Sequence, residues 1–428
     1  MTPEKGARAA FRYPSFRLWM IARFLVTASS EMQAVAVGWQ IYAVTHRPLD
    51  LGLAGLAQFL PGVLLFLVAG HVADHFPRKR ILQLCYLAFS MCSLLLLTFT
   101  VHGLRSAYPI YAALLLNGTV RAFNGPTSQA FLPSLVPAEI FPTAVAWASS
   151  IFQASTILGP MLGGVVYAWA GTAIPVYACA ATGGVLAMIL LSFVQVRAAG
   201  RPRLAPSPGA VIEGLRYIRG NKLILGAISL DLFAVLLGGA VALLPVYARE
   251  ILKVGTAGLG ALRAAPGVGA VIMAIIVAHW PIQRRAGVAL LSWVFCYGVF
   301  TVVFGISHSF VLSLAALCLA GASDMVSVIV RHTLVQLSTP DEMRGRVSAV
   351  NMVFIGASNE VGQFESGITA QWFGTVPAVV LGGVGTVAVV LLWARFFPTL
   401  RRVDRLVPQE IPKSQYADSK ASPASSQV

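Results

Sequence analysis

The segment GHVADHFPRKR, at residues 70–80, joins two apolar runs that extend over 51–71 and 81–101. Each run is about twenty residues long, which is enough for one helix to cross a bilayer. The segment between them contains several acidic and basic side chains, so it must lie in water at the membrane surface. Apolar runs separated by short polar connections continue through the chain. This pattern predicts a protein with many membrane-spanning helices.

The composition agrees with a membrane protein. The chain has 428 residues, of which 57% are hydrophobic and only 11% charged, whereas a soluble domain has about 25% charged residues. The formal charge of +15 would suit a nucleic-acid partner in a soluble protein, but the basic residues stand between apolar runs rather than along a polar face. We therefore expect a lipid bilayer as a partner and no nucleic acid.

The apolar runs predict an all-α membrane protein with twelve transmembrane helices in two pseudo-symmetric six-helix bundles. We place the helices at 18–44, 51–71, 81–101, 108–130, 143–170, 174–196, 223–248, 256–280, 287–306, 309–333, 347–371 and 375–397. The expected domains are a cytoplasmic N-terminal segment (1–17), the first bundle (18–196), a cytoplasmic linker with a short amphipathic helix (197–222), the second bundle (223–397) and a disordered cytoplasmic tail (398–428).

The positions of lysine and arginine predict the orientation in the membrane. Clusters of basic residues follow the even-numbered helices, at 78–80, 197–222, 284–285, 344–346 and 401–405. The segments that follow the odd-numbered helices contain only Arg47, Arg105, Arg249, Lys253 and Arg263 as basic residues. Because basic loops stay in the cytoplasm, both termini are expected there.

An internal repeat supports two related halves. A shift of 203 residues aligns Pro137 with Pro340, Gly159 with Gly362 and Gly164 with Gly367. A shift of 200 aligns residues 29–38 with residues 229–238. Duplicated halves are typical of secondary transporters.

Ionisable residues within the apolar runs are functional candidates, because a charge in hydrocarbon is costly unless it borders a wet cavity or a partner. These residues are Arg23, Glu31, Arg121, Asp231, Asp324 and Glu360. The 203-residue shift aligns Arg121 with Asp324, so we expect these two to form or break an ion pair across a central cleft. The candidates for proton coupling are Glu31, Arg121, Asp324, Asp231 and Glu360. The alternative is that Arg23 and Asp231 only pair locally or reach toward the membrane surface.

The segment at 70–80 resembles the loop signature G-x-x-x-D-R-x-G-R-[KR] of the major facilitator superfamily. The resemblance implies that Asp74 docks on a neighbouring helix end and that Arg78 helps to close the cytoplasmic side in the outward-facing state. His75 replaces the usual arginine, and Pro77 replaces the usual glycine. The expected cytoplasmic gate comprises Gly70, Asp74, His75, Arg78, Arg344 and Arg346. The alternative is an ordinary basic loop.

Three further motifs extend the resemblance over nearly the whole chain. RAFNG at 121–125 is similar to the R-x-x-Q-G signature of proton-coupled members, and STILGPMLGG at 155–164 is similar to the antiporter signature, which implies export. The residues expected to pack helices in that signature are Gly159, Pro160, Gly163 and Gly164. STPDEMRGRVSA at 338–349 and GWQIY at 38–42 resemble a bacterial branch of enterobactin exporters and transmembrane secretion effectors. There, Arg344 and Arg346 are expected to pair with Asp341, Glu342 or the following helix end, or only to cap that helix.

These features predict a proton-coupled exporter in the bacterial inner membrane, which moves a small amphiphilic organic molecule by alternating access. We expect a monomer with a midplane site lined by the first, fourth, seventh and tenth helices. The candidates for the substrate cavity are Trp39, Tyr42, Phe59, Phe233 and Met325. A metabolite uniporter or proton symporter is one alternative, and a membrane receptor or secretion accessory is another. The chain has no phosphate-binding loop and no histidines at metal-ligand spacing, so we expect no enzyme, cofactor or metal.

Overall fold

The computed structural model describes residues 9–196, 208–282 and 284–404. The first half of the chain contains α1 (Pro14–Thr45), α2 (Pro48–Leu64), α3 (Phe66–His75), α4 (Arg78–Val101), α5 (Tyr108–Phe131), α6 (Phe141–Ala170) and α7 (Ile174–Ser192). The second half contains α8 (Pro208–Gly220), α9 (Lys222–Leu237), α10 (Leu244–Val246), α11 (Gly255–His279), α12 (Ala286–Ile306), α13 (Phe310–Leu337), α14 (Asp341–Phe373), α15 (Thr375–Phe396) and α16 (Pro398–Arg401). Every predicted span contains helix, and most helix ends agree within a few residues.

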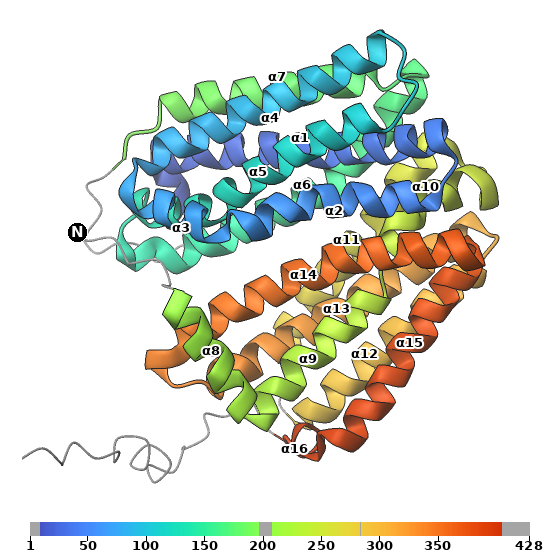
Figure 1. Cartoon of the computed structure of the whole chain (residues 1–428). Coiled ribbons are helices and arrows are strands. Elements are labelled where there is room, and N and C mark those ends of the chain that lie inside the picture. Colours follow the sequence, from blue (N-terminus) through green and yellow to red (C-terminus); the bar gives the residue numbers. More distant parts are fainter. Residues whose placement is uncertain (1–8, 197–207, 283, 405–428) are drawn as a thin grey trace, which may run out of the picture.

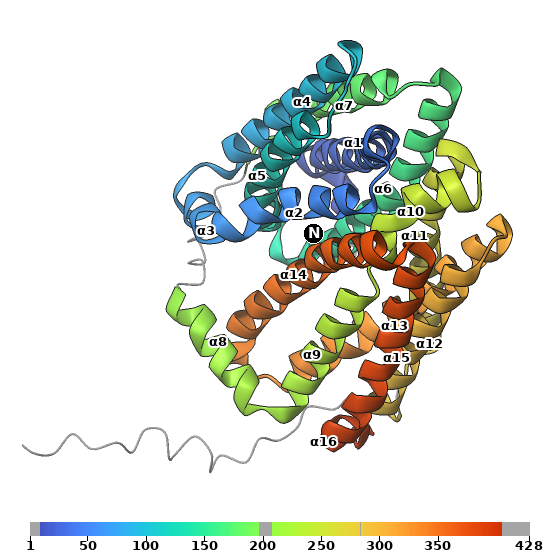
Figure 2. The same cartoon turned by 45° about the vertical axis from the view of Figure 1, so that its right-hand side comes forward.

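The helices form two bundles, α1–α7 and α9–α15, which lie side by side (Figure 1 and Figure 2). The bundles meet mainly where α6 packs on α11 and α2 packs on α14. They spread apart toward the side where α8 and α16 lie (Figure 1). We call this side the α8 end of the molecule and the other side the α10 end.

Equivalent glycines make equivalent contacts in the two halves, as the internal repeat predicts. Gly159 of α6 packs on α1, and its counterpart Gly362 of α14 packs on α9. Gly164 of α6 packs on α11, and its counterpart Gly367 packs on α2. A Cβ atom added to Gly164 would lie only 2.4 Å from the carbonyl oxygen of Thr256. The repeat therefore places one close helix crossing within each half and two between the halves, α6 on α11 and α14 on α2.

The seventh predicted span, 223–248, is interrupted. Helix α9 ends at Leu237, and a short 3-10 turn, α10 and a π-helix (Tyr247–Ile251) continue toward the α10 end. The interruption falls at Gly238 and Gly239, where added Cβ atoms would lie 2.6 Å from the hydroxyl of Tyr297 and 2.5 Å from the carbonyl oxygen of Gly362. Only a residue without a side chain lets α12 and α14 approach so closely. This approach depends on the tertiary structure, so hydropathy does not reveal it.

Eight helical segments in the described part of the chain are long and apolar enough to cross a membrane. Helices α1, α2, α5 and α14 are outside this set. They carry Glu31, Gln58, Arg121 and Glu360, respectively. Because lipid does not solvate such groups, these helices must turn their polar faces toward one another.

Both ends of the chain differ from the expectation. Helix α1 begins at Pro14 rather than at 18, and Ala10 and Phe16 are buried in the core of the first half. The expected disordered tail is wrong for residues 398–404, because Leu400 is buried and the Asp404 carboxylate accepts a hydrogen bond from the backbone N–H of Arg285 at 3.1 Å. Residues 405–428 lie outside the described part. Helix α8 falls within the predicted linker, of which 197–207 is not described.

Candidate functional site

A cavity of about 310 Å³ lies between the two halves and is the first candidate site. We call it the interface cavity. Helices α1, α2, α4, α5 and α6 line it from the first half, and α11 and α14 line it from the second. Its polar lining includes Thr27, Ser30, Glu31, Gln33, Gln58, Asn117, Arg121, Asn124, Arg263, Glu360 and Gln363. The helices that are too polar for lipid thus meet at this cavity.

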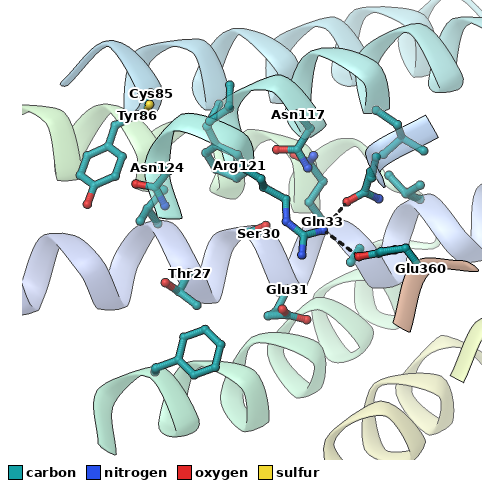
Figure 3. A pocket seen from close by; sticks show the side chains of 18 of the residues that line it. Thr27, Ser30, Glu31, Gln33, Cys85, Tyr86, Asn117, Arg121, Asn124 and Glu360 are labelled. Atoms are coloured by element: carbon teal, nitrogen blue, oxygen red, sulfur yellow. Dashed lines mark hydrogen bonds and ion pairs between the residues drawn. The ribbon is translucent and has the colours of Figure 1, made fainter. Parts of the chain in front are cut away.

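An ion pair crosses the interface cavity and joins the two halves. The Arg121 Nη1 lies 3.5 Å from the Glu360 Oε1, and Figure 3 shows Arg121 pointing toward Glu360. The same Nη1 donates to the Oε1 of Gln58 at 3.0 Å, and Gln363 Nε2 donates to Glu360 Oε2 at 3.2 Å. The Arg121 side chain remains 56% exposed. It therefore has free N–H donors for a molecule that enters the cavity.

Three other polar groups face the interface cavity without a partner. Within the described part of the chain, Glu31 and Arg263 form no hydrogen bond or ion pair, although the charge of Arg263 acts on Glu360. The Oδ1 of Asn124 is buried and also has no hydrogen-bond partner among the described residues. Buried polar groups normally have partners. The carboxylate of Glu31, the guanidinium of Arg263 and the amide oxygen of Asn124 are therefore available to bind a polar ligand.

A second cavity, of about 220 Å³, lies within the second half among α9, α11, α12, α13 and α14. We call it the second-half cavity. Arg331 lies 3.1 Å from the Asp231 carboxylate and donates to the Oδ1 of Asn351 at 3.1 Å. The side chains of Arg331 and Asp231 are only 3% and 7% exposed. Asp324 lines the same cavity without a hydrogen bond or ion pair to another described residue.

The structure does not contain the expected ion pair between Arg121 and Asp324. Arg121 pairs with Glu360 instead, and Asp324 lies in the second-half cavity. The repeat aligns the two residues by sequence, but equivalent positions in pseudo-symmetric halves need not face each other. Asp231 makes the local pair that the alternative interpretation described.

Two arginines of these cavities were not among the sequence candidates. Arg331 lies near the end of the predicted span 309–333, but α13 continues to Leu337 and buries it. Arg263 was counted as a loop charge, but it lies two turns inside α11 and faces the interface cavity. The hydropathy pattern places both arginines on membrane helices, so their positions could have identified them.

Arg78 and His75 of the expected gate form their hydrogen bonds within the first half. Arg78 Nη1 donates to the carbonyl oxygen of Ala130 at 2.9 Å, near the end of α5 in the same half. Gly70 and His75 lie on α3, and His75 Nδ1 is 2.9 Å from the carbonyl oxygen of His71. The side chain of Asp74 lies outside the described part.

Arg346, a gate residue of the second half, forms a different contact from those expected. Arg346 pairs with Glu213 of α8 rather than with Asp341 or Glu342 of its own segment. Arg344 is exposed near the start of α14. Arg346 therefore attaches α8 to the end of the second bundle.

The antiporter-like motif lies at a junction of three helices. Gly159 and Gly163 face α1, where added Cβ atoms would lie 2.6 Å from the Glu31 Cβ and 2.7 Å from the carbonyl oxygen of Met32. On the other side, Gly164 and the carbonyl of Pro160 face α11. The motif therefore packs α6 against both its own half and the other half, and it holds the backbone next to Glu31.

The five expected cavity residues, Trp39, Tyr42, Phe59, Phe233 and Met325, line neither of the two cavities described here. Phe233 packs instead on Trp393, with ring centroids 5.3 Å apart. The aromatic rings of the interface cavity are Tyr86, Phe89 and Phe152. Aromatic residues are so frequent on membrane helices that their type alone did not separate cavity from packing positions.

Trp39 and Tyr42 lie at the α10 end, where they join the halves. The Tyr42 hydroxyl donates to the Glu250 Oε1, and the Arg249 guanidinium lies 5.6 Å from the centre of the Trp39 ring. Arg249 and Glu250 both belong to the π-helix that follows α10. We call these contacts the α10-end clamp. They join the two halves at this end.

The fold is that of major facilitator transporters. Over 91% of this chain and 98% of the other, it matches a bacterial homolog of the human lysosomal transporter Spinster in an inward-facing and occupied conformation, with a TM-score of 0.71 and 13% identity. A D-xylose–proton symporter matches with a TM-score of 0.68 and 13% identity, over 90% of this chain and 98% of the other. The chain thus shares the fold of these multi-pass membrane transporters.

Sequence comparison identifies the family within this class. The model of the family described as transmembrane secretion effector matches residues 5–421, so the chain belongs to that family. The enterobactin exporter EntS of Shigella boydii serotype 4 is 27% identical over 406 residues, covering 93% of this chain and 95% of the relative. The enterobactin exporter EntS of Escherichia coli O1:K1 is 26% identical over 407 residues, which cover 93% of this chain and 95% of that relative.

The α10-end clamp gives a testable prediction. Tyr42→Phe removes a hydrogen bond to a carboxylate, which contributes about 1.5–3 kcal/mol, and about 1.4 kcal/mol is a tenfold change in an equilibrium. We therefore expect Tyr42→Phe to lower the population of this conformation roughly tenfold or more relative to one closed at the α8 end. The measurement uses spin labels on cysteines that replace Gly125 and Gly356, where an added Cβ would contact nothing within 4 Å. Pulsed electron paramagnetic resonance gives the distance between the two labels and so the separation of the halves.

The matched control is Tyr108→Phe, which removes an equally polar hydroxyl from a residue that is 80% exposed at the same end. It should leave the distance distribution between the labels unchanged. An unchanged distribution in Tyr42→Phe as well would show that the clamp does not stabilise this conformation.

Proposed function

We propose that this transporter is a proton-coupled exporter of a small amphiphilic organic molecule, siderophore-like or drug-like, and that it works by alternating access. The observation that carries the proposal is the interface cavity, whose ionisable groups come from both halves and meet in the Arg121–Glu360 ion pair. A ligand bound there contacts both bundles at once. It can therefore bias how the bundles are arranged, because a ligand shifts an equilibrium by its differential affinity for the two states.

The lining of the interface cavity supports an amphiphilic substrate. Tyr86, Phe89 and Phe152 offer aromatic surface, while Arg121, Arg263 and the unpaired Asn124 amide offer hydrogen-bonding groups. Such a combination of apolar walls and a few directed polar groups is typical of small-molecule sites. The relatives named as enterobactin exporters favour export and a siderophore-like cargo.

The carboxylates in the two cavities support proton coupling. Glu31 and Asp324 have no hydrogen bond or ion pair within the described residues, so each can exchange a proton without first breaking a salt bridge. We assign them as the leading proton carriers. Arg121 and Glu360 couple the interface cavity to the contact between the halves, and Asp231 sets the charge around Asp324.

The proposed topology places the α8 end in the cytoplasm, with both termini on that side and the protein acting as a monomer in a bacterial inner membrane. The basic clusters at 78–80, 284–285, 344–346 and 401–402 lie at or beside helix ends on the side of the α8 end. Under the positive-inside rule, this distribution favours a cytoplasmic α8 end. The side on which the bundles spread apart then faces the cytoplasm, from which an exporter takes its substrate (Figure 1).

The experiment that tests the function uses inverted membrane vesicles that contain the protein. Siderophores, macrolides and dyes are offered outside, with and without an imposed pH gradient that is acidic inside. We expect substrate to accumulate in the vesicles only when the gradient is present, and a protonophore to abolish the accumulation. Vesicles with Arg121→Ala protein serve as the control, because this variant lacks the ion pair across the interface cavity and should accumulate little substrate.

The alternatives give different results in the same vesicles. A uniporter would equilibrate its substrate at the same rate with or without the gradient, and a proton symporter would accumulate it only when the gradient is reversed. A receptor or secretion accessory would bind the ligand with no uptake under any gradient. Any of these three results would contradict the proposal.

A further inference from the structure

Helix α8 packs on the second bundle with one face only. Gly214 lies so close to α14 that an added Cβ would be 2.8 Å from the carbonyl oxygen of Arg346. Glu213 pairs with Arg346, and Ile218 is 1% exposed in a small core formed with α9, α13 and α14. The Tyr217 hydroxyl lies 3.4 Å from the carbonyl oxygen of Ser338. These contacts fix how the helix is rotated about its axis.

The opposite face of α8 is exposed and has an unusual composition. Ile212 and Leu215 are 58% and 47% exposed, and Arg216 and Arg219 are exposed as well. With about 100° between successive residues of a helix, these four lie within roughly 100° of one another. The stripe carries two large apolar side chains and two guanidinium groups, and its four residues include no acid. The acid of this helix, Glu213, is occupied by Arg346.

The position of α8 places this stripe at a membrane boundary. Only Asn221 separates α8 from α9, whose apolar segment Lys222–Ile251 is long enough to span the bilayer. The Asn221 side chain caps α9 by accepting hydrogen bonds from the N–H groups of Leu223 and Ile224. Figure 1 shows α8 crossing the ends of α9 and α14 instead of continuing along the bundle. The helix therefore lies where acyl chains give way to lipid headgroups.

We propose that the stripe of Ile212, Leu215, Arg216 and Arg219 binds anionic phospholipid, with the two apolar side chains inserted among the lipids and the two arginines on headgroup phosphates. An exposed apolar pair is unfavourable in water and favourable at the upper edge of the acyl region. Guanidinium groups bind phosphate through paired N–H donors, and basic residues next to a membrane helix are attracted to anionic lipid. The lipid contact would thus hold α8, and through Glu213 and Arg346 the start of α14, at a fixed level of the membrane.

The first test measures the depth of the stripe in nanodiscs of phosphatidylcholine and phosphatidylglycerol. A nitroxide label is placed on Leu215→Cys in a Cys179→Ser background, because Cys179 is exposed on α7. We expect the label to be more accessible to molecular oxygen, which concentrates in lipid, than to a water-soluble nickel chelate. A label on Arg105→Cys, in an exposed loop at the α10 end, should show the reverse order. Greater accessibility of the Leu215→Cys label to nickel would overturn the proposal.

The second test measures the charge requirement. Phosphatidylglycerol added to the detergent-purified protein is expected to raise the midpoint of thermal unfolding. The double variant Arg216→Gln/Arg219→Gln should lose most of this rise. The matched control, Arg105→Gln/Lys253→Gln, removes the same charge from exposed positions at the α10 end and should keep the rise. Soluble glycerol phosphate should give no rise, which separates a lipid surface from free phosphate.

A full rise in the Arg216→Gln/Arg219→Gln variant, or an equal rise with glycerol phosphate, would overturn the proposal. Neither readout requires transport. The lipid contact can therefore stand if the proposed export function fails, and it can fail while export is observed.

Discussion

Replacing Asp231 by alanine is expected to lower the free energy of unfolding by about 3–5 kcal/mol, because removing one partner of a buried ion pair leaves the other charge uncompensated. Arg331, the residue left behind, is only 3% exposed, and its remaining partner in the structure is the side-chain amide of Asn351. Its Nε is already buried without a hydrogen-bond partner among the described residues. Asp324 lines the same cavity and its charge acts on Arg331, but the two form no hydrogen bond or ion pair, so no other carboxylate in the described part of the chain is in direct contact with the guanidinium. Thermal or denaturant unfolding of the protein in detergent measures the loss.

Two variants check this explanation. Asp231→Ala combined with Arg331→Met removes both charges and should recover most of the stability, because an apolar pair often replaces a buried ion pair at little cost. Arg47→Ala breaks an ion pair with Asp50 in which the arginine is 58% exposed, and it should cost only about 0–1 kcal/mol. An equal loss in Asp231→Ala and in the double variant would show that the burial of Arg331 is not the cause.

The apolar runs were sufficient to predict most of the helices. The run predicted at 108–130 is α5, Tyr108–Phe131, and the run predicted at 287–306 is α12, Ala286–Ile306. Such agreement has a simple cause, since a helix in lipid must satisfy its own backbone and its length is set by the bilayer. A break in the helix within a membrane span is not marked by a change in hydropathy. The break at Gly238 and Gly239 depends on how closely α12 and α14 approach, which a local pattern does not contain.

The candidate site was predicted in part. Glu31, Arg121 and Glu360 were selected because ionisable groups stand out in apolar runs, and all three line the interface cavity. Their pairing was not predictable, because hydropathy gives the depth of a residue and not the direction of its side chain around the helix. The repeat suggested Asp324 as the partner of Arg121, whereas α14, which packs on α2, brings Glu360 within 3.5 Å of Arg121 on α5. Only the rotation of each helix in its bundle decides between such partners.

The same limit explains the aromatic residues. Trp39 lies on α1, which lines the interface cavity, yet its ring stacks with Arg249 at the α10 end. Tyr86 of α4 lines the cavity, although nothing in its local sequence distinguishes it from other aromatic residues in apolar runs. A residue's type and depth are thus insufficient where lipid, packing and cavity positions share one composition.

Neutralising either proposed proton carrier, by Glu31→Gln or Asp324→Asn, is expected to reduce gradient-driven export to the level of vesicles that lack the protein. Each change keeps the size of the side chain and removes its ability to exchange a proton. Neither residue forms a hydrogen bond or ion pair with another described residue, so the loss should not come from a broken contact. The rate of substrate accumulation in inverted vesicles with an imposed pH gradient measures the effect.

Counterflow separates a lost proton step from a lost substrate site. In vesicles preloaded with unlabelled substrate and without a gradient, exchange for labelled substrate needs binding and reorientation but no net proton movement. Asp324 lies in the second-half cavity, away from the interface cavity, so Asp324→Asn should retain counterflow, whereas Glu31→Gln should weaken it because Glu31 also lines the substrate cavity. Glu139→Gln, at an exposed acid outside both cavities, should retain both activities. Normal gradient-driven export by both the Glu31 and Asp324 variants would remove these two carboxylates from the proton pathway.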